Sequence, residues 1–575
     1  MDKKIVLIII LIICTVIVLS YIGYMIFLNG NGVIKLNKKV SKLQESLLND
    51  KDLNFAREEY VVFLSVSDSK EKAYVTNGIG NTLKEAIDNA KSKMKVNISL
   101  YKINPEWVRI DVVNKEEVLK TNDLKEDLFG SENEYRKGLS LDKNYDVALL
   151  ENELNVNKII DYKNREINLE NLNKYLNSEN KNLKGIDNLP DEFISFSCIS
   201  YMYDEKEVYR LGIESENYGR KEEKDLREVR LIEIMENASE YLIDCVDENG
   251  KFIYRYNPLD DNTTNTYNIL RHEGTVWSML EVYKITKNKE LKENIELATK
   301  FVVNKSVKDK DENTSYIIEN KNNEIKLGAN GIGILMFIEY METFNTDEYK
   351  ELVLKLGNGI LDMQNEDGSY YHVYMYPDFK KYEEYRTVYY DGEATFALAK
   401  LYEYTKDEKY LKAAEKALDY FYENNYEKHK DHWIEYAVNE VTKYNPKKEY
   451  FELGLKNVRD NLSTIVNTNY CNPINLELLT VGLEIYDRAS KNNIFIDDFD
   501  VEDLISAIYY RADYQLNGLF YKEIAMYFKN PSRIVNSFFT RDDDFRVRID
   551  DVQHNINGYY NMFKNYKLIE EYSKK

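Results

Sequence analysis

The pattern of apolar and polar positions changes three times along the chain. Residues 5–28 form an uncharged apolar run, IVLIIILIICTVIVLSYIGYMIFL. At about 1.5 Å of rise per residue, such a run is long enough for a helix to cross a hydrocarbon core of about 30 Å. A signal peptide would have a shorter apolar region, of about 7–15 residues, and a cleavage site of small residues, and neither is present here. The run therefore predicts an uncleaved transmembrane anchor over residues 1–29. The polar residues 30–57 predict a linker or a short stalk helix.

Between residues 58 and 228 the pattern alternates between strands and helices. Alternating or continuous apolar runs predict strands near residues 60–68, 107–114, 145–151 and 193–203. Helical spacing predicts helices near residues 82–94 and 167–177, and Thr82 with Glu85 forms a capping box at the start of the first. The region therefore predicts a small α+β domain. Its sequence shows no nucleophile elbow, phosphate loop or metal-ligand spacing, so its role stays open.

Helical periodicity dominates residues 229–575. Twelve helices are predicted, near 229–246, 268–286, 289–304, 330–344, 347–364, 391–405, 407–425, 432–444, 447–461, 474–490, 499–515 and 551–568. Amphipathic helices alternate with more apolar ones, which indicates an outer helix followed by an inner helix in each of six hairpins. Six hairpins closed in a ring form an (α/α)6 toroid, whereas an open α-solenoid repeats such pairs without closing. Long loops before residues 391 and 551 favour the toroid, because they suit functional loops on one rim.

The composition narrows the range of partners. The chain of 575 residues has a net charge of −22 and lacks a basic block, which argues against nucleic acid as a partner. The four cysteines lie far apart without a metal-ligand spacing, so the sequence predicts neither a metal nor a cofactor. The 49 tyrosines are explained by biased composition and core packing, or alternatively by carbohydrate contact, since an aromatic ring stacks on a sugar face.

In a toroid the inner helices all begin at one mouth, and candidate functional residues gather at those predicted starts. Three of the five histidines lie there, and the other two lie in loops that lead into inner helices. The predicted acid–base residues are Glu393, Asp391, Glu273 and Asp551. The predicted substrate-binding residues are Arg271, His272, His554, His432, Trp433, Trp277, Tyr390 and Asp550.

Each candidate also has a structural interpretation. An aspartate at a helix start, such as Asp391 or Asp551, can be a cap, and a buried histidine can be a satisfied core residue. Glu393 and Glu273 are followed by small and apolar residues, so they are expected to face a ring interior and to need a partner there. Paired carboxylates suit glycoside hydrolysis. Histidine with carboxylates suits abstraction and return of a proton beside a carbonyl, as in epimerases. The sequence gives no distances and leaves both open.

The helical part resembles the six-hairpin glycosidase-like superfamily of (α/α)6 toroids. The resemblance is carried by the hairpin count and by YNILRHEGTVWSMLEVYKIT, YYDGEATFALAKLYEYTKDEKYLKAAEKALDYF and RIDDVQHNINGYYNMF. Families of this architecture include unsaturated uronyl hydrolases, N-acylglucosamine 2-epimerases and D-glucuronyl epimerases, so the resemblance implies carbohydrate as the substrate class. Lanthionine-synthetase-like cyclases share a similar toroid but hold zinc with cysteines and a Cys-His pair, and Cys471 stands without such a pair.

These observations predict a membrane-anchored, extracytoplasmic enzyme, either a glycoside hydrolase or a sugar epimerase, that acts on a cell-surface polysaccharide. The alternative is a non-catalytic glycan-binding or scaffold protein of the cell envelope. Lysines flank the apolar run on both sides, so charge alone leaves its orientation open, and a short amino tail with the bulk of the chain outside is preferred.

Overall fold

The structure is a computed structural model that describes residues 30–53, 58–120, 136–161, 164–178, 188–214, 217–223, 225–383, 388–495, 497–541 and 543–574. These residues form two compact units. The first contains the described residues up to Glu222 together with Pro258–Asp261 and Phe520–Val535, and the second contains the rest. The predicted anchor lies outside the described residues. Among the helices that are described, none is long and apolar enough to cross a membrane.

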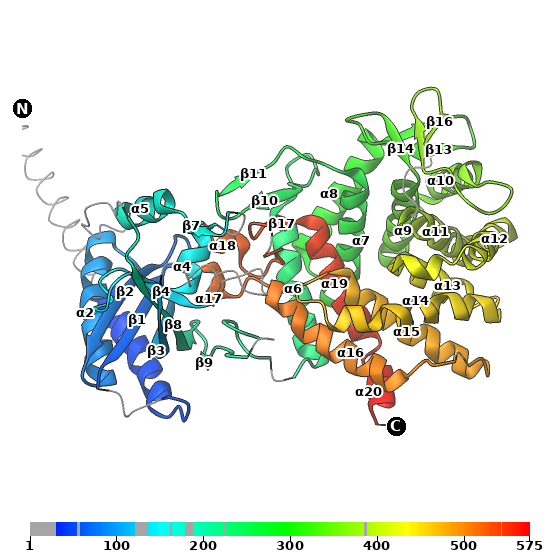
Figure 1. Cartoon of the computed structure of the whole chain (residues 1–575). Coiled ribbons are helices and arrows are strands. Elements are labelled where there is room, and N and C mark those ends of the chain that lie inside the picture. Colours follow the sequence, from blue (N-terminus) through cyan, green and yellow to red (C-terminus); the bar gives the residue numbers. More distant parts are fainter. Residues whose placement is uncertain are drawn as a thin grey trace, which may run out of the picture. The chain divides into compact units, whose positions relative to one another are not determined.

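The first unit is built on a seven-stranded antiparallel sheet (Figure 1). Its strand order is β2 (Tyr74–Gly80), β1 (Tyr60–Ser67), β3 (Trp107–Lys120), β8 (Glu192–Tyr203), β4 (Gly138–Ser140) and β5 (Ala148–Leu149), with β9 (Val208–Arg210) paired to β8. The helices and remaining strands of this part are α2 (Leu83–Tyr101), α4 (Glu151–Val156), α5 (Leu169–Ser178), β6 (Ile160–Asp161) and β7 (Glu166–Ile167). The α+β class is as expected. The sequence missed β2, and the run at 145–151 contains only the two-residue β5 before α4 begins.

Two helices cover one face of this sheet. Residues 30–48 are helical, and Leu36, Val40 and Leu43 share a buried core with α2 and with the alternate residues of β1 and β3. The spacing of those leucines and valines by three or four residues places them on one helix face. The segment expected to be a linker or stalk is therefore part of the core of the first unit.

The other face of the sheet packs against a segment from late in the sequence. Phe520–Val535, with α17 (Lys522–Ala525) and α18 (Pro531–Ile534), belongs to the first unit. The Tyr527 hydroxyl lies 2.9 Å from Ser65 Oγ on β1, and the Glu523 carboxylate accepts hydrogen bonds from the Tyr209 hydroxyl and the Lys221 backbone N–H. The chain leaves the second unit after Leu519 and re-enters it beside Phe538, and these two residues form a β-bridge. Sequence periodicity gave no sign that this segment joins the first unit.

The second unit contains the twelve predicted helices, with ends within a few residues of the expected ones. The outer helices are α6 (Glu228–Asp244), α8 (Lys289–Lys305), α10 (Lys350–Met363), α12 (Glu408–Glu423), α14 (Lys448–Val466) and α16 (Val501–Tyr514). The inner helices are α7 (Ile269–Thr286), α9 (Leu327–Phe344), α11 (Tyr390–Thr405), α13 (His432–Val441), α15 (Ile474–Lys491) and α19 (Ile549–Lys564). A short helix, α20 (Tyr566–Ser573), follows α19.

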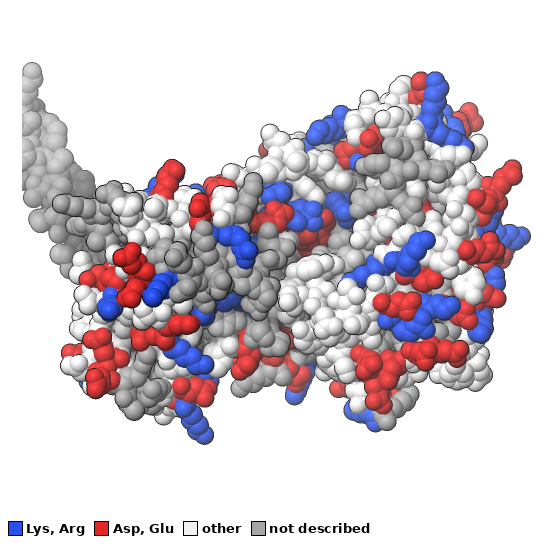
Figure 2. Space-filling model, viewed as in Figure 1, with Lys and Arg blue, Asp and Glu red and all other residues white. Residues whose placement is uncertain are grey.

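The inner helices form a closed ring. Each packs against the next in chain order, and α19 packs against α7, which closes the circle. The expected (α/α)6 toroid of six hairpins is therefore confirmed, and an open solenoid is excluded. The inner helices are buried on most sides, whereas the outer helices bury one face. Figure 2 shows acidic and basic side chains interspersed over the described part of the face in view.

Short strands lie at the end of the ring where the inner helices begin. β14 (Glu324–Lys326) leads directly into α9, and β17 (Val547–Arg548) leads directly into α19. β14 pairs with β15 (Val373–Met375), which pairs with β16 (Lys380–Glu383); β17 pairs with β10 (Arg255–Asn257), which pairs with β11 (Asn262–Thr263). The hairpin of β12 (Val307–Asp309) and β13 (Ser315–Ile317) precedes β14. These loops form the rim of the mouth at which the candidate residues were expected to meet.

Candidate active site

Two histidines from different inner helices face each other inside the ring. His432 begins α13 and His554 lies in the second turn of α19, and their ring centroids are 5.2 Å apart at an interplanar angle of 82°. Their exposed fractions are only 2% and 5%. Neither ring nitrogen of His432 has a hydrogen-bond partner among the described residues. A buried polar group without a partner is costly unless it is kept for a ligand or a reaction, so His432 is a candidate for the centre of the site.

Glu477, near the start of α15, orients the second histidine. Its Oε1 lies 2.7 Å from His554 Nδ1, and its Oε2 accepts a hydrogen bond of 2.8 Å from the Tyr436 hydroxyl. Asn561 in turn donates to that hydroxyl at 2.6 Å. Because Nδ1 of His554 is engaged by Glu477, Nε2 is the nitrogen left for a substrate. A carboxylate that fixes one ring nitrogen also fixes the tautomer and the direction of the other.

Burial sets the protonation of this group. It lowers the pKa of His432 and of His554 to about 3 each, and the charge of Arg271 lowers the latter further. It raises the pKa of Glu477 to about 7. At neutral pH both imidazoles are therefore neutral, and the one titratable proton of the group is held by the Glu477–His554 pair.

Aromatic rings line the ring interior beside the histidines. Trp277 lies 5.8 Å from Trp433 and 6.0 Å from Tyr436, measured between ring centroids, and Phe396 stacks on Tyr436 at 5.2 Å. These rings come from α7, α11 and α13, so the packing of three inner helices brings them together. The four side chains are only 3–7% exposed, and an aromatic ring that reaches a bound sugar can stack on its apolar face.

A charged cluster joins the starts of α7, α11 and α19. Arg271 Nε lies 3.4 Å from Asp550 Oδ2. Burial opposes the charge of Arg271, but Asp550 and Glu393 outweigh it and raise its pKa. The guanidinium is therefore fixed as a cation and can polarise an oxygen of a bound substrate.

Glu273 and Glu393 lie where α7 and α11 approach α9. Both oxygens of Glu273 are buried without a hydrogen-bond partner among the described residues. Burial, with the charges of Glu319 and Glu393, raises the pKa of Glu273 well above its ordinary range, which favours the protonated form of this carboxyl group. Glu393 packs against Gly328, where a side chain at position 328 would collide with the carboxylate.

Three of the predicted residues make contacts that are typical of structural groups. His272 Nε2 donates to the Ala298 carbonyl at 2.9 Å, and Nδ1 lies 2.7 Å from the Tyr267 hydroxyl. Asp391 is hydrogen-bonded to His372 Nε2 at 2.8 Å and to the Tyr426 hydroxyl at 3.0 Å. Neither His272 nor Asp391 is directed at the His432–His554 pair by these contacts. Tyr390 packs its ring edge-on against His372.

Asp551 binds two arginines from the segment just before α19 and is therefore a structural group of the rim. Its carboxylate accepts hydrogen bonds from Arg548 at 2.7 and 3.0 Å and from Arg546 at 2.6 Å. Burial alone would raise its pKa, but these two arginines hold the pKa below its ordinary value. A carboxylate bound in this way stays ionised and ties the loop before α19 to the helix.

Sequence reasoning missed Glu477, although the same signal was present. Glu477 follows Asn472-Pro473 and precedes the apolar run Leu478-Leu-Thr-Val-Gly-Leu, the same pattern of an acid at a helix start that singled out Glu273 and Glu393. Tyr436, which contacts Glu477, lies one helical turn after His432, so the sequence alone could also have placed Tyr436 on the same helix face as His432. The partner of Glu477 on α19 could not be deduced, because it depends on which helices are neighbours across the ring.

The same three side chains would also suit a metal ion. One ligand atom each from His432, Glu477 and His554 lie within 4.8 Å of one another. A zinc-type site needs nitrogen and oxygen ligands about 2.0–2.2 Å from the metal, so these atoms would have to move closer together. The expectation that no metal or cofactor is used stays a prediction.

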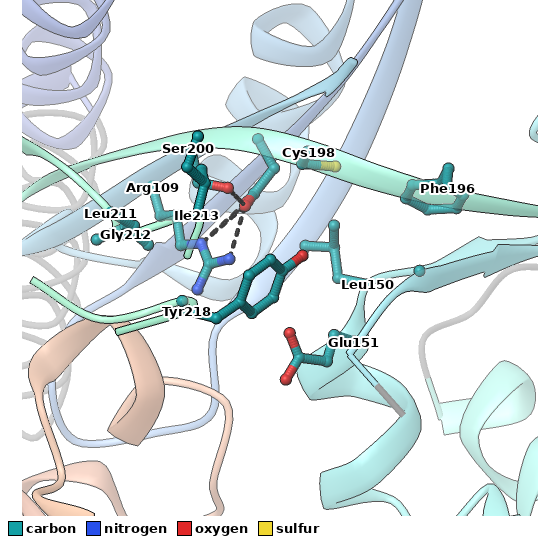
Figure 3. A pocket seen from close by; sticks show the side chains of 13 residues that line it. Arg109, Leu150, Glu151, Phe196, Cys198, Ser200, Leu211, Gly212, Ile213 and Tyr218 are labelled. Carbon is teal, nitrogen blue, oxygen red and sulfur yellow. Dashed lines mark hydrogen bonds and ion pairs between the residues drawn. The ribbon is translucent and has the colours of Figure 1, made fainter. Parts of the chain in front are cut away.

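The first unit contains a small pocket of its own (Figure 3). In it the Arg109 side chain donates to Asp111 at 2.7–3.1 Å, and Ser200 donates to the same carboxylate at 2.5 Å. The cavity measures about 20 Å³, which is room for about one water molecule. This pocket is too small for a sugar.

Comparisons with known proteins found similarity among solved structures alone. No protein-family model matches the chain, and no curated protein matches its sequence. Among solved structures, the chain is similar to a D-mannose isomerase (TM-score 0.46, 12% identity, covering 59% of this chain and 98% of the other). It is also similar to cellobiose 2-epimerase from Bacillus thermoamylovorans (0.45, 14%, 58% and 99%) and to an alpha-1,6-mannanase from a Salegentibacter species (0.39, 10%, 58% and 98%). At these identities the similarity concerns the fold alone, so the function is argued from the residues of this chain.

Proposed function

We propose that the protein is a carbohydrate-active enzyme that moves a proton at the carbon beside the carbonyl of a sugar, as an epimerase or isomerase. The observation that carries this proposal is the buried pair His432 and His554, in which one ring has no hydrogen-bond partner and the other is oriented by Glu477. This proposal assigns the acid–base role to two histidines, whereas the sequence analysis assigned it to Glu393, Asp391, Glu273 and Asp551.

The site can take one proton from the substrate and return one proton to it. His432 takes the proton from the substrate carbon, while Arg271 stabilises the oxygen on which negative charge develops. His554 returns a proton from Nε2 to the opposite face of that carbon, and its Nδ1 is reprotonated by the carboxyl group of Glu477. The enzyme then holds the same number of protons as before, now on His432 instead of Glu477, and the reverse reaction runs through the same groups.

The aromatic surface supports carbohydrate as the substrate class. Trp433 and Tyr436 contact the rings of the histidine pair, and Trp277 contacts both of these aromatic rings. A sugar stacked on these rings would bring its reacting carbon close to the imidazoles, and neighbouring polar groups would bind its hydroxyls. We retain a cell-surface polysaccharide, or a sugar at its end, as the expected source of the substrate.

A glycoside hydrolase is the second candidate. It is favoured by Glu273, a buried carboxyl group with a raised pKa and no hydrogen-bond partner among the described residues, which is suited to protonate a leaving oxygen, with Glu393 or Asp550 as the second carboxylate. It gives no role to the pairing of His554 with Glu477, so we rank it below the epimerase. A non-catalytic glycan-binding protein would retain the stacking surface but show no turnover.

The test is an incubation in heavy water, read by NMR. The protein should begin at residue 30, because residues 30–48 are part of the core of the first unit, and the panel should include reducing monosaccharides, uronic acids, amino sugars and their polymers. Deuterium at the carbon beside the carbonyl, without chain cleavage, is the expected result. New reducing ends would instead establish the hydrolase, and binding without either change would establish the glycan-binding protein.

Variants connect the result to the site. His432→Gln and His554→Gln should each lower the rate of deuterium incorporation by about 10²- to 10⁴-fold, the usual contribution of a general acid or base. His272→Gln is the matched control, because that ring is bonded to Tyr267 and Ala298 instead, and its rate should stay within a few fold per folded molecule. Equal losses in all three variants would contradict the assignment.

Removal of metal ions separates acid–base chemistry from metal chemistry at the same residues. Dialysis against a chelator should leave the rate unchanged if the imidazoles act alone. A loss that added zinc restores would show that His432, Glu477 and His554 hold a catalytic ion, and the proton-transfer roles given above would then be wrong.

We also propose that residues 5–28 anchor the protein in a membrane as a single-pass helix, with the two units outside the cytoplasm. The support is the uncharged apolar run in the sequence. Membrane flotation of the full chain and of a version that begins at residue 30 tests the anchor. Protease added to intact cells tests the side, and protection of both units from it would reverse the orientation.

A further inference from the structure

Apolar side chains gather at one end of the first unit. Ile34 on the helix of residues 30–48 and Val96, Leu100 and Tyr101 on α2 have exposed fractions of 65%, 63%, 64% and 40%. Val96 and Leu100 are four residues apart, so they lie on the same face of α2. We call these four residues the apolar end of the first unit. They account for four of the twelve large exposed apolar residues in the described part of the chain.

Packing brings together the two helical segments that carry the apolar end. Gly32 lies against Ile98 and Ile103, so the first turn of the helix of residues 30–48 packs beside the last turn of α2. The approach needs a glycine, since a Cβ at position 32 would lie 2.9 Å from the Ile103 carbonyl oxygen. Lys35 Nζ donates to Asn104 at 2.8 Å, which fixes the same two segments to each other. The start of the helix of residues 30–48 and the end of α2 therefore lie side by side, and the Tyr101 ring stacks on Tyr74 of β2 with 4.8 Å between ring centroids.

The position of this surface in the chain indicates what covers it. The described helix begins at residue 30, one residue after the predicted anchor and two residues after the last position of the uncharged run. Ile34 is six residues from that run, which corresponds to about 9 Å along a helix. A membrane that held residues 5–28 would therefore have its surface within reach of the apolar end.

The composition of the surface suits the boundary between headgroups and acyl chains. Aliphatic and tyrosine side chains enter this layer, and lysines beside them extend their ammonium groups toward the headgroups. Lys35, Lys38, Lys95 and Lys102 lie within four residues of a member of the apolar end in the sequence. The overall charge of −22 does not oppose this contact strongly, since charges more than about 10 Å away are largely screened by salt.

We propose that the apolar end of the first unit rests in the membrane interface and sets the orientation of this unit on the bilayer. This inference depends on the proposed anchor but not on the proposed reaction. In this arrangement α2 is a second membrane contact beside the anchor, and the first unit serves as the base of the protein.

The test uses the full chain in lipid nanodiscs with an environment-sensitive fluorophore on a single introduced cysteine. Leu100→Cys and Ile34→Cys are the test sites, and the parent chain treated identically gives the background from the native cysteines. Val118→Cys on β3 is the matched control. Val118 is 58% exposed, and it lies eleven residues beyond Trp107, which is about 36 Å along a strand.

The expected result is blue-shifted emission at positions 34 and 100, with loss of intensity when the lipids carry bromine on the upper acyl chain, and neither change at position 118. If the emission at positions 34 and 100 is the same as in water while the chain still floats with lipid, this inference is wrong, and the proposed anchor is unaffected. Failure of the full chain to float with lipid would overturn both. Loss of enzymatic activity would bear on neither.

Discussion

At the scale of single residues, the site is defined by what each buried polar group touches. His272 and His554 are both buried histidines near inner helix starts, yet both nitrogens of His272 have structural partners, whereas one nitrogen of His554 is engaged by Glu477. His432 has no partner at all among the described residues. Hydrogen bonding, rather than residue type or burial, therefore separates the proposed acid–base pair from a core histidine.

Glu477 should control the pH dependence of the reaction. The proposed cycle needs one titratable proton on the group formed by His432, His554 and Glu477. Glu477, with a pKa of about 7, carries this proton before the reaction. We expect kcat/KM to be high below pH 7 and to fall as pH rises through about 7. In Glu477→Gln the proton would have to reside on an imidazole with a pKa of about 3, so the fall should move to acid pH and kcat should drop. An unchanged profile in this variant would contradict the role of Glu477.

The same carboxyl group should make stability depend on pH. The pKa of Glu477 in the folded protein, about 7, exceeds its ordinary value of 4.5. Its contribution to stability is therefore fully present below pH 4.5 and is lost as pH rises through 7, by up to about 3 kcal/mol. Glu477→Gln should accordingly be as stable as the parent near pH 4.5 and more stable at pH 8. Thermal unfolding at both pH values measures this, and equal stability differences at the two would contradict the burial of a titrating Glu477.

At the scale of helices, the mouth exists because inner helices approach closely at their starts. Gly392 in the first turn of α11 lies against the start of α13, where a Cβ would come within 2.6 Å of Trp433 Cβ and 2.8 Å of the Ile434 nitrogen. Gly331 on α9 lies in the same way against the backbone of Glu393. Small residues at these two contacts bring the starts of α9, α11 and α13, and with them Glu393 and His432, into one mouth.

Gly392→Ala should disturb both stability and activity. The added methyl group meets backbone atoms that cannot rotate away, so we expect a loss of about 1–3 kcal/mol and a lower kcat, because α13 carries His432. Gly454→Ala on the outer helix α14 is the matched control. A Cβ there meets side-chain atoms alone, those of Ile485 and Val438 at 3.1 Å and Oε2 of Glu435 at 3.3 Å, and alanine favours a helix by about 1 kcal/mol over glycine. Thermal unfolding and initial rates compare the two, and equal effects would show that helix approach at Gly392 is not critical.

At the scale of the whole molecule, the chain does not divide at one boundary. The loop between α16 and α19 contributes Phe520–Val535 to the core of the first unit, and Phe520, Met526, Tyr527 and Phe528 are fully buried there. Arg109 on β3 donates to the Glu523 carbonyl at 3.0 Å. After this segment the chain continues to the strand and helix that carry Arg548 and His554.

Removal of the first unit should therefore expose apolar surface. A chain of residues 223–575 would leave the four buried aromatic and methionine side chains of Phe520–Val535 without their core, and we expect it to bind a hydrophobic dye and to aggregate. The control is the same chain with residues 520–535 replaced by a short glycine-serine linker between Leu519 and Phe538, which already form a bridge. If the unmodified chain of residues 223–575 stays monomeric and binds no dye, the segment does not depend on the first unit.

The sequence determined the elements because their periodicity is local. The spacing of apolar residues defined all twelve toroid helices within a few residues, and the alternation of outer and inner helices implied the ring. The polar starts of the inner helices indicated the mouth and placed His432, His554, Arg271 and Glu273 in it. Each of these inferences depends on residues that are near one another in the chain.

Tertiary structure alone decided which of those residues act together. The pairing of His554 with Glu477, the lack of a partner for His432 and the structural bonds of His272 and Asp391 depend on which helices are neighbours around the ring. The packing of residues 30–48 and of Phe520–Val535 into the first unit likewise joins separate segments, and Tyr527 contacts Ser65 from 462 residues along the chain. Periodicity indicates that a side chain is buried, but it does not indicate which residues that side chain contacts. Contacts between distant segments are known only once the ring is closed and the sheet is packed.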